Sequence, residues 1–324
     1  MLKLVKRLSK KNQQSKFIYT YAYHGDEEDL CRMEMRAFFG FDSQSNVVKS
    51  NVQIVPSRSP FMKDRIKVLY ESDHLAAILE QLQQIELNGK TFKVTCLNTI
   101  DLGSTKKIGY EKRRAVERDI GMHIDGEPDF ENPQIEYAIA LIDEQWVFGK
   151  HMQTEPIWFH HQKKPHSYSI ALNTRVARAV ANIAVPHPDG VRAIDPCCGI
   201  GTVLIEALSM GIHMVGRDIN YQIVEGTKKN LIYFGYVGDV VTGPISEVTT
   251  NYDVAVIDMP YNHFSHISPE DQQSIITNAR RFSKKVVVVT IENMDAMIEK
   301  AGFKIIDRGE ARKGNFVREI LICE

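Results

Sequence analysis

The sequence predicts an α/β protein in which small α+β modules precede a larger domain built on a parallel sheet. From Val191 onward, apolar strands alternate with helical segments, an order that places helices on both faces of a parallel sheet. The first of these strands, 191–194, runs into the glycine-bearing turn Asp195-Pro-Cys-Cys-Gly-Ile-Gly-Thr202, which opens a helix. Glycine lets a ligand approach the backbone, and the unpaired N–H groups of a helix N-terminus attract it. This turn therefore predicts a nucleotide-cofactor site.

Two further strand ends extend the predicted site. Strand 213–217 finishes in Asp218, about where a carboxylate grips a ribose diol in nucleotide-binding folds. Strand 252–257 runs into Asp258-Met-Pro-Tyr261, which brings a carboxylate, a proline and an aromatic ring to a third strand end.

The first 85 residues predict a βαββα module. The segment 26–39 reads as a helix because acids occupy its first turn, apolar residues share one face, and Gly40 follows its last turn. The remaining elements of this module are predicted at 17–23, 47–55, 65–70 and 73–85.

A second small module begins at the Asn88-Gly89 turn and ends near residue 152. Apolar and polar residues alternate over 91–97, which predicts a half-buried strand. A helix is expected over 111–122. Strands are expected over 135–142 and 145–148, and they should form a hairpin around Asp143-Glu144.

Basic residues concentrate around the helix of the second module. They are Lys106, Lys107, Lys112, Arg113, Arg114 and Arg118. Such a run is compatible with an ordinary solvated helix face or with a face that contacts phosphates. Lys106 and Lys107 would widen the same patch, which favours RNA contact.

The segment 152–165 predicts a polar connector to the C-terminal domain. It is followed by His166 and contains His160, His161, Lys163 and Lys164. No cysteine accompanies these histidines, so a zinc site is not expected. We expect the connector to lie on nucleic acid or in solvent, with Lys163 and Lys164 as RNA contacts.

The C-terminal domain is predicted to start with a helix over 173–183 and to finish with an antiparallel hairpin at the sheet edge, formed by 303–308 and 316–323. The strands between them are expected at 191–194, 213–217, 240–242, 252–257 and 286–291, and the helices at 202–210, 221–233, 269–281 and 293–301.

Composition and charge limit the functional classes. The 324 residues carry a net charge of −1, so an RNA-binding surface must be local rather than global. The five cysteines are scattered apart from one adjacent pair, which predicts no disulfide framework. No apolar run approaches the roughly 20 residues of a membrane helix, and residues 1–16 lack an apolar signal core. We expect a cytoplasmic monomer that binds no metal.

The glycine turn and the Asp258-Met-Pro-Tyr261 segment together resemble the cofactor loop and catalytic loop of class I S-adenosylmethionine-dependent amino-methyltransferases. The chain is most similar to the THUMP-domain tRNA guanine-N2 methyltransferases, in the branch that modifies guanine 10. The segments 111–121, 129–133 and 146–149 look like the THUMP core, and 165–169 looks like the lead-in to the cofactor domain.

The resemblance implies a Rossmann-like, seven-stranded methyltransferase domain over 173–324. A ferredoxin-like module (1–85), a THUMP-like RNA-binding module (86–152) and a linker (153–172) would precede it. It further implies S-adenosylmethionine as cofactor and tRNA as partner. The implied cofactor-binding residues are Ser167, Tyr168, Asp195, Cys197, Gly199, Gly201, Thr202, Asp218, Ile219 and Ile245.

The expected catalysis depends on the exocyclic amine of guanine, a poor nucleophile because its lone pair is delocalised into the ring. We expect the Asp258 carboxylate and a main-chain carbonyl near Met259 to accept the two amine hydrogens. Pro260 would stiffen the turn, and Tyr261 would stack on the flipped base. The methyl donor is already activated, so positioning supplies most of the acceleration.

Two departures from the family pattern leave alternatives open. Met259 stands where relatives usually have proline, and Gly243-Pro244 stands where they often carry an acid for the adenine amine, leaving adenine to the backbone near Ile245. The chain could instead methylate another guanine N2 or an adenine N6 in tRNA or rRNA, or bind RNA without catalysis. A nicotinamide oxidoreductase would not need the Asp-Met-Pro-Tyr segment.

Overall fold

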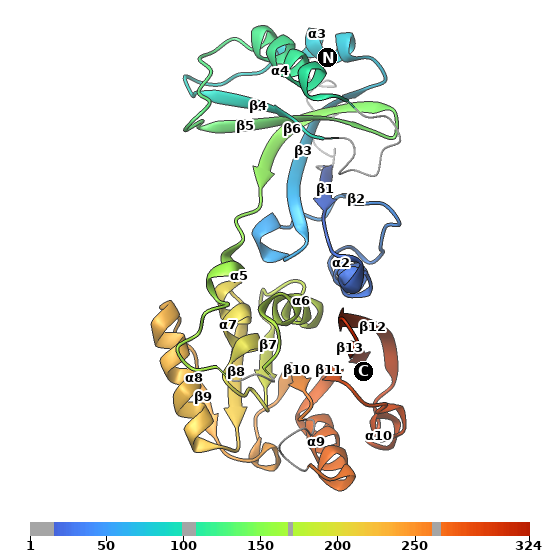
Figure 1. Cartoon of the computed structure of the whole chain (residues 1–324), viewed down its shortest axis with the longest axis vertical. Helices are drawn as coiled ribbons and strands as arrows, with labels where there is room; N and C mark the ends of the chain where they lie inside the picture. Colours follow the sequence, from blue (N-terminus) through green and yellow to red (C-terminus); the bar gives the residue numbers. More distant parts are fainter. Residues whose placement is uncertain (1–15, 99–107, 168–170, 261–266) are drawn as a thin grey trace, which may run out of the picture. The chain divides into compact units, whose positions relative to one another are not determined.

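The computed structural model describes residues 16–98, 108–167, 171–260 and 267–324. By their contacts these residues form two compact units, both drawn in Figure 1. Unit 1 contains the described residues of 1–22, 43–56 and 62–155, and unit 2 those of 23–42, 57–61 and 156–324. Segments 23–42 and 57–61, which the sequence assigns to the first module, therefore pack with the C-terminal part of the chain.

Unit 1 is built on one six-stranded sheet in the order β2-β1-β3-β6-β5-β4. Two helices, α3 (Leu75–Leu82) and α4 (Tyr110–His123), share an apolar core with this sheet through Ile78, Val116 and Phe148. The division of this unit into a ferredoxin-like and a THUMP-like module stays a prediction. The strands are β1 (Phe17–Tyr21), β2 (Val47–Ser50), β3 (Met62–Ser72), β4 (Phe92–Cys96), β5 (Ile135–Ile142) and β6 (Gln145–Gln153).

Several bounds in unit 1 differ from those that the sequence predicts. The strand expected over 65–70 extends to Met62–Ser72, because β3 pairs with β1 on one side and with β6 on the other. The strand expected over 145–148, β6, extends to Gln153 through the same pairing with β3. The strand expected over 47–55 ends at Ser50, and the chain continues into a short 3-10 helix, η2 (Pro56–Arg58).

Unit 2 contains a seven-stranded sheet in the order β12-β13-β11-β10-β7-β8-β9, which confirms the predicted fold class (Figure 1). Five neighbouring strands, β11, β10, β7, β8 and β9, run parallel to one another. The β12–β13 hairpin is antiparallel and forms the other edge of the sheet, as the sequence predicts. The strands are β7 (Arg192–Asp195), β8 (His213–Asp218), β9 (Val240–Thr242), β10 (Tyr252–Asp258), β11 (Ser283–Thr290), β12 (Ile305–Lys313) and β13 (Phe316–Cys323).

The helices of unit 2 begin and end at local signals. Asn220 caps the start of α8, and Gly235 ends it in the left-handed conformation. Ser268 and Asp271 form a capping box at the start of α9. The helices are α2 (Glu28–Phe39), α5 (Ile157–His160), α6 (Thr174–Ala184), α7 (Thr202–Ser209), α8 (Tyr221–Phe234), α9 (Pro269–Phe282) and α10 (Asp295–Lys300), with 3-10 helices η1 (Gly25–Glu27) and η3 (Ile245–Glu247).

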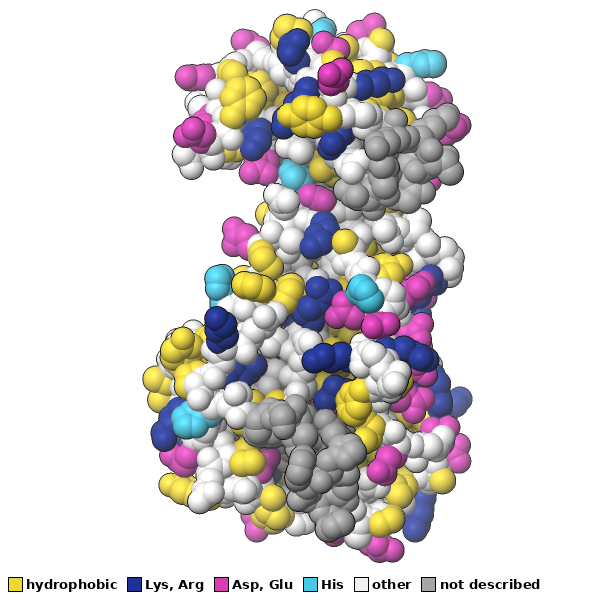
Figure 2. Space-filling view, in the orientation of Figure 1, with side chains coloured by type: hydrophobic (Ala, Val, Ile, Leu, Met, Phe, Trp, Pro, Cys, Tyr) yellow, Lys and Arg dark blue, Asp and Glu magenta, His cyan; other side chains and the backbone are white. Residues whose placement is uncertain are grey.

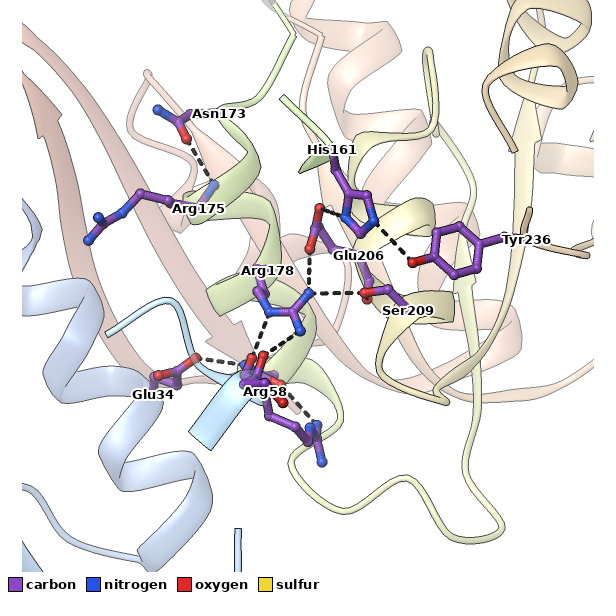
Figure 3. Close-up of polar contacts among 11 residues, drawn as sticks. Glu34, Arg58, His161, Asn173, Arg175, Arg178, Glu206, Ser209 and Tyr236 are labelled. Atoms are coloured by element: carbon purple, nitrogen blue, oxygen red, sulfur yellow. Dashed lines mark hydrogen bonds and ion pairs between the residues drawn. The ribbon is translucent and has the colours of Figure 1, made fainter. Parts of the chain in front are cut away.

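A buried polar network holds α6 and α7 together (Figure 3). The Arg178 guanidinium, 1% exposed, donates to Glu206 Oε2 at 2.6 Å, to Ser209 Oγ at 2.9 Å, and to the carbonyls of Ser57 and Arg58. His161 Nδ1 lies 2.7 Å from Glu206 Oε1. We call Arg178, Glu206, Ser209 and His161 the α6–α7 network.

His161 corrects the expectation for the connector. Its ring is 3% exposed, and its Nε2 lies 3.0 Å from the Tyr236 hydroxyl, so it belongs to the interior of unit 2 rather than to solvent or an RNA surface. The contact with Glu206 holds this histidine in the interior. Glu206 is distant in sequence, so the local sequence pattern does not indicate the contact.

Helix α2 is joined to the same part of unit 2. Glu34 is fully buried and accepts hydrogen bonds from the Ser59 hydroxyl and from Asn182 Nδ2. Burial raises the pKa of Glu34 to about 7, although both hydrogen bonds and the nearby Arg58 and Arg178 charges oppose this rise.

Candidate active site

A cavity of about 840 Å³ lies at the carboxyl ends of β7, β8 and β10. Parallel strands end at the same edge of a sheet, and the crevice outside these ends is the usual ligand position in open α/β folds. The residues after each of the three strands line this cavity, and so do segment 244–246 and one face of α9. Its volume is in the range of pockets that hold small molecules.

The glycine turn after β7 has the backbone that the sequence predicts. Gly199 and Gly201 have φ angles of 52° and 79°, in the left-handed region that favours glycine. A Cβ on Gly201 would lie 2.6 Å from Thr227 Cγ2, and the Gly199 carbonyl accepts from Thr227 Oγ1 at 2.5 Å. Helix α8 thus fixes the turn from behind and requires glycine at position 201.

Asp218, at the end of β8, is bonded directly to this turn. Its Oδ2 accepts from the Gly199 N–H at 3.0 Å, and its Oδ1 accepts from the Asn220 N–H at 2.9 Å. The carboxylate also lines the cavity. A carboxylate oxygen can accept more than one hydrogen bond, so Asp218 retains capacity for a ligand hydroxyl.

Asp195 and Asp258 lie at the ends of adjacent strands and both line the cavity. Burial, with the charge of Asp258 as the next contribution, raises the pKa of Asp195 well above its usual range. Burial raises the pKa of Asp258 to about 6, and the charge of Arg318 opposes this rise. Within the described part of the chain, Asp258 Oδ1 is buried and has no hydrogen-bond partner.

Met259 and Pro260 continue from β10 and line the cavity, and Tyr261 lies outside the described residues. The Met259 N–H donates to the Val289 carbonyl at 2.8 Å, and the residue is 1% exposed in an apolar cluster with Ile276 and Met294. The methionine therefore fills a core position, which a proline could occupy only by giving up that hydrogen bond.

The other predicted cofactor residues divide into three groups. Cys197, Thr202, Ile219 and Ile245 line the cavity. Among the described residues, the buried Thr202 Oγ1 has no hydrogen-bond partner. Ser167 is exposed and does not contribute to the lining, and Tyr168 lies outside the described residues.

Helix α9 contributes a wall that the sequence interpretation missed. Its four lining residues, Asp271, Ser274, Ile275 and Asn278, follow the i, i+3, i+4, i+7 spacing of one helix face. Three of the four are polar, so the pattern looks like a solvated surface. The signal that could have found this face is that α9 is the first described helix after the Asp258-Met-Pro-Tyr261 segment.

The predicted RNA-binding residues are partly brought together in unit 1. Arg113, Arg114 and Arg118 line a groove of about 780 Å³ beside β4, together with the exposed rings of Tyr110 and Phe130. Figure 2 shows Lys and Arg side chains interspersed with hydrophobic ones over this unit. Lys112 is exposed but does not line the groove, and Lys106 and Lys107 lie outside the described residues.

The two connector lysines belong to unit 2 and differ from each other. Lys163 is exposed, whereas Lys164 is half-buried and burial lowers its pKa. Lys164 is therefore less suited than Lys163 to a phosphate contact in solvent.

In the described parts of the chain, no helix is long and apolar enough to cross a membrane. The same residues contain no group of three or more His, Cys, Asp or Glu side chains that could hold a metal ion.

The comparison with protein-family models matches residues 162–301 to the family described as RMKL-like, methyltransferase domain. Among curated proteins, the chain is 28% identical over 181 residues to the tRNA (guanine(10)-N2)-dimethyltransferase of Methanothermobacter thermautotrophicus, covering 52% of this chain and 54% of that protein. The human U6 snRNA (guanine-N(2))-methyltransferase THUMPD2 is 25% identical over 198 residues, covering 59% and 38%. The chain thus spans about half, or less, of the length of these relatives.

Among solved structures, TrmN from Thermus thermophilus aligns with 95% of this chain and 99% of its own, at a TM-score of 0.47 and 16% sequence identity.

Proposed function

We propose that this chain transfers a methyl group from S-adenosylmethionine to the N2 amine of a guanine in tRNA, since residues 162–301 match the RMKL-like methyltransferase-domain family. The observation that carries this proposal is the single cavity in which the glycine turn, Asp218 and Asp258 meet, with one Asp258 oxygen buried and unpaired among the described residues. The two relatives are named as guanine-N2 methyltransferases, one for guanine 10 of tRNA and the other for U6 snRNA, and these names support guanine N2 as the target atom. We take guanine 10 as the first candidate.

The residues around the turn fit S-adenosylmethionine. Asp218 retains acceptor capacity for the ribose hydroxyls, and Thr202 Oγ1, which has no partner among the described residues, lies at the start of α7. Gly199 lines the cavity and has no side chain that could stand between the ligand and the turn, whereas Gly201 does not line the cavity and is required by its contact with Thr227. Asp195, whose raised pKa reflects its burial, accepts from the Cys197 N–H at 3.3 Å and would orient the turn.

When bound, this cofactor supplies a methyl group already activated by a positive sulfur, so the chain must mainly position the acceptor amine. The ionised Asp258 carboxylate would accept a hydrogen bond from the amine. This hydrogen bond would localise the nitrogen lone pair and favour its attack on the methyl carbon. The same carboxylate would then receive the proton that the methylated amine loses. Since the pKa of Asp258 is about 6, it is mostly ionised at neutral pH.

The second N–H of the amine would donate a hydrogen bond to the main-chain carbonyl at Met259. The hydrogen bond from the Met259 N–H to Val289 extends the strand pairing to this residue and restrains its peptide. The missing proline therefore need not loosen the loop at this point. Tyr261 would stack on the base, by resemblance to the family's catalytic loop.

The groove in unit 1 is our candidate for the RNA-contacting surface. Arg113, Arg114 and Arg118 can contact phosphates, and Tyr110 and Phe130 offer rings on which unpaired bases stack. Charge and aromatic rings occur together in this groove, which a purely solvated helix face does not require.

The direct test is methyl transfer to bulk tRNA by the purified chain, followed by mass spectrometry of the tRNA nucleosides. We expect N2-methylguanosine at one position, and none with Asp258→Ala. Formation of N6-methyladenosine would redirect the proposal to another amine, and no transfer by wild-type protein to tRNA or to U6 snRNA would contradict it.

A further inference from the structure

The cofactor cavity has a polar wall on α9 for which the proposed reaction gives no role. Asp271, Ser274 and Asn278 share this wall with Ile275. At about 1.5 Å rise per residue, Asp271 and Asn278 lie roughly 10 Å apart along the helix axis. The wall therefore runs away from the catalytic-loop end of α9, and Asn278 lies near its far end.

Arg281 places the Asn278 amide beside η3. Its Nη1 donates to Asn278 Oδ1 at 2.7 Å and to the Ser246 carbonyl at 3.1 Å. Both Ser246 and Asn278 line the cavity. One guanidinium nitrogen thus joins the α9 wall to the segment that follows β9.

The cavity also offers an apolar surface for a flat ring. Six isoleucines line it, and four of these are Ile219, Ile223, Ile245 and Ile275. These four come from the region after β8, from η3 and from α9, so aliphatic groups reach the cavity from three parts of the chain. Such a lining suits the faces of a purine, while its polar edge still requires partners.

The segment after β9 does not provide an acidic partner for that edge. Gly243 and Pro244 occupy the strand end, and the nearest acid, Glu247, does not line the cavity. Its Oε2 lies 3.6 Å from Arg217 Nη1 instead. A hydrogen-bond acceptor for a purine amine must therefore come from a residue outside 243–247 or from the backbone.

The Asn278 amide has the remaining hydrogen-bonding capacity to read adenine. Its Oδ1 receives one hydrogen bond from Arg281, and its Nδ2 donates to the Ser274 carbonyl at 2.8 Å and to the Ser274 hydroxyl at 3.3 Å. One lone pair of the amide oxygen is left as an acceptor. An amide oxygen that accepts from the N6 amine is one of the contacts by which asparagine recognises adenine.

We propose that Asn278 recognises the adenine of S-adenosylmethionine, in place of an acid after β9. The proposal rests on the proposed cofactor and adds the residue that selects its base. Arg281 is then a positioning residue, because it holds the amide against η3 without contacting the base.

The test is calorimetric binding to the full chain of S-adenosylhomocysteine and of its inosine counterpart, which has hypoxanthine in place of adenine. We expect wild-type protein to prefer the adenine compound by about tenfold or more. Hypoxanthine has a carbonyl oxygen in place of the N6 amine, so the hydrogen bond to Asn278 Oδ1 is lost and two acceptor oxygens face each other. Asn278→Ala should weaken the adenine compound about tenfold and bring the two affinities within about threefold.

Two variants serve as controls. Asn278→Asp keeps an acceptor for the amine and for Arg281, so it should retain the preference for adenine. Thr277→Ala alters the neighbouring residue, which is exposed and does not line the cavity, and should bind as wild type does.

The outcomes separate this inference from the proposed function. If Asn278→Ala is folded and keeps the wild-type affinity and preference, the inference is wrong while the cofactor assignment stands. If wild-type protein binds neither compound, both are wrong. If Asn278→Ala fails to fold, a loss of adenine preference in Asn278→Asp still contradicts the inference, and its retention supports it.

Discussion

The α6–α7 network and the carboxylates of the cavity are both polar and buried, yet they differ in how many of their polar atoms have hydrogen-bond partners within the protein. In the network, all three Arg178 nitrogens and both Glu206 oxygens have partners within the described residues. At the cavity, Asp258 has a buried oxygen without one, and its pKa is raised. A buried polar group whose hydrogen bonds are all made stabilises the fold. A buried polar atom without a partner lowers stability unless a ligand binds to it. The contrast separates residues that hold unit 2 together from residues that we propose act in its reaction.

The strongest test of the network is Arg178→Met. This change leaves Glu206 buried without its guanidinium, so we expect the free energy of unfolding to fall by about 3–5 kcal/mol in urea titrations. Arg308→Met is the matched control: Arg308 pairs with Asp295 and Glu319 at the surface, where ion pairs contribute less than about 1 kcal/mol. Equal losses in the two variants would remove the distinction between the buried network and a surface ion pair.

Glu34 tests the same interior through pH. Its pKa in the folded chain, about 7, lies above the ordinary value of 4.5, so the folded state binds this proton more tightly. The resulting stability is complete below pH 4.5 and is lost as the pH rises through 7, by about 2–4 kcal/mol. Thermal or urea unfolding across pH 5–8 should show this fall in wild type.

Glu34→Gln should flatten that dependence, because the glutamine does not titrate. The exposed Glu299→Gln is the control and should keep the wild-type slope. A slope unchanged by Glu34→Gln would mean that another group causes it.

Asp218 belongs to the cavity side of the comparison and should affect ligand binding more than folding. We expect Asp218→Ala to weaken S-adenosylhomocysteine about 10- to 100-fold in calorimetry, the range for lost hydrogen bonds to a charged group. Asp239→Ala removes an exposed acid that precedes β9 and should leave affinity unchanged. Equal affinities of the two variants would exclude Asp218 from the cofactor site.

The sequence predicts much of the sheet and of the cavity because their signals are local. The strand ends at Asp195, Asp218 and Asp258 follow apolar runs, and parallel strands bring such ends to one edge. The structure brings these three carboxylates to one cavity, as that reasoning expects.

The remaining features depend on contacts between distant segments. Glu34 lies in a helix with acidic neighbours and could pass for a surface residue, but Ser59 and Asn182 enclose it. Asn278 lies on a largely polar helix face, and only its place beside η3 makes it a candidate for adenine recognition. Neither packing partner is visible in the local pattern.

The most direct test of the account measures two properties of Asp258→Asn, which keeps the size of the side chain and removes its charge. We predict that S-adenosylhomocysteine binds within about threefold of wild type, because Asp258 is assigned to the amine rather than to the cofactor. Methyl transfer to tRNA in a single turnover should fall at least about a hundredfold. Transfer at the wild-type rate by the folded, cofactor-binding variant would contradict the role of Asp258 and with it the central claim.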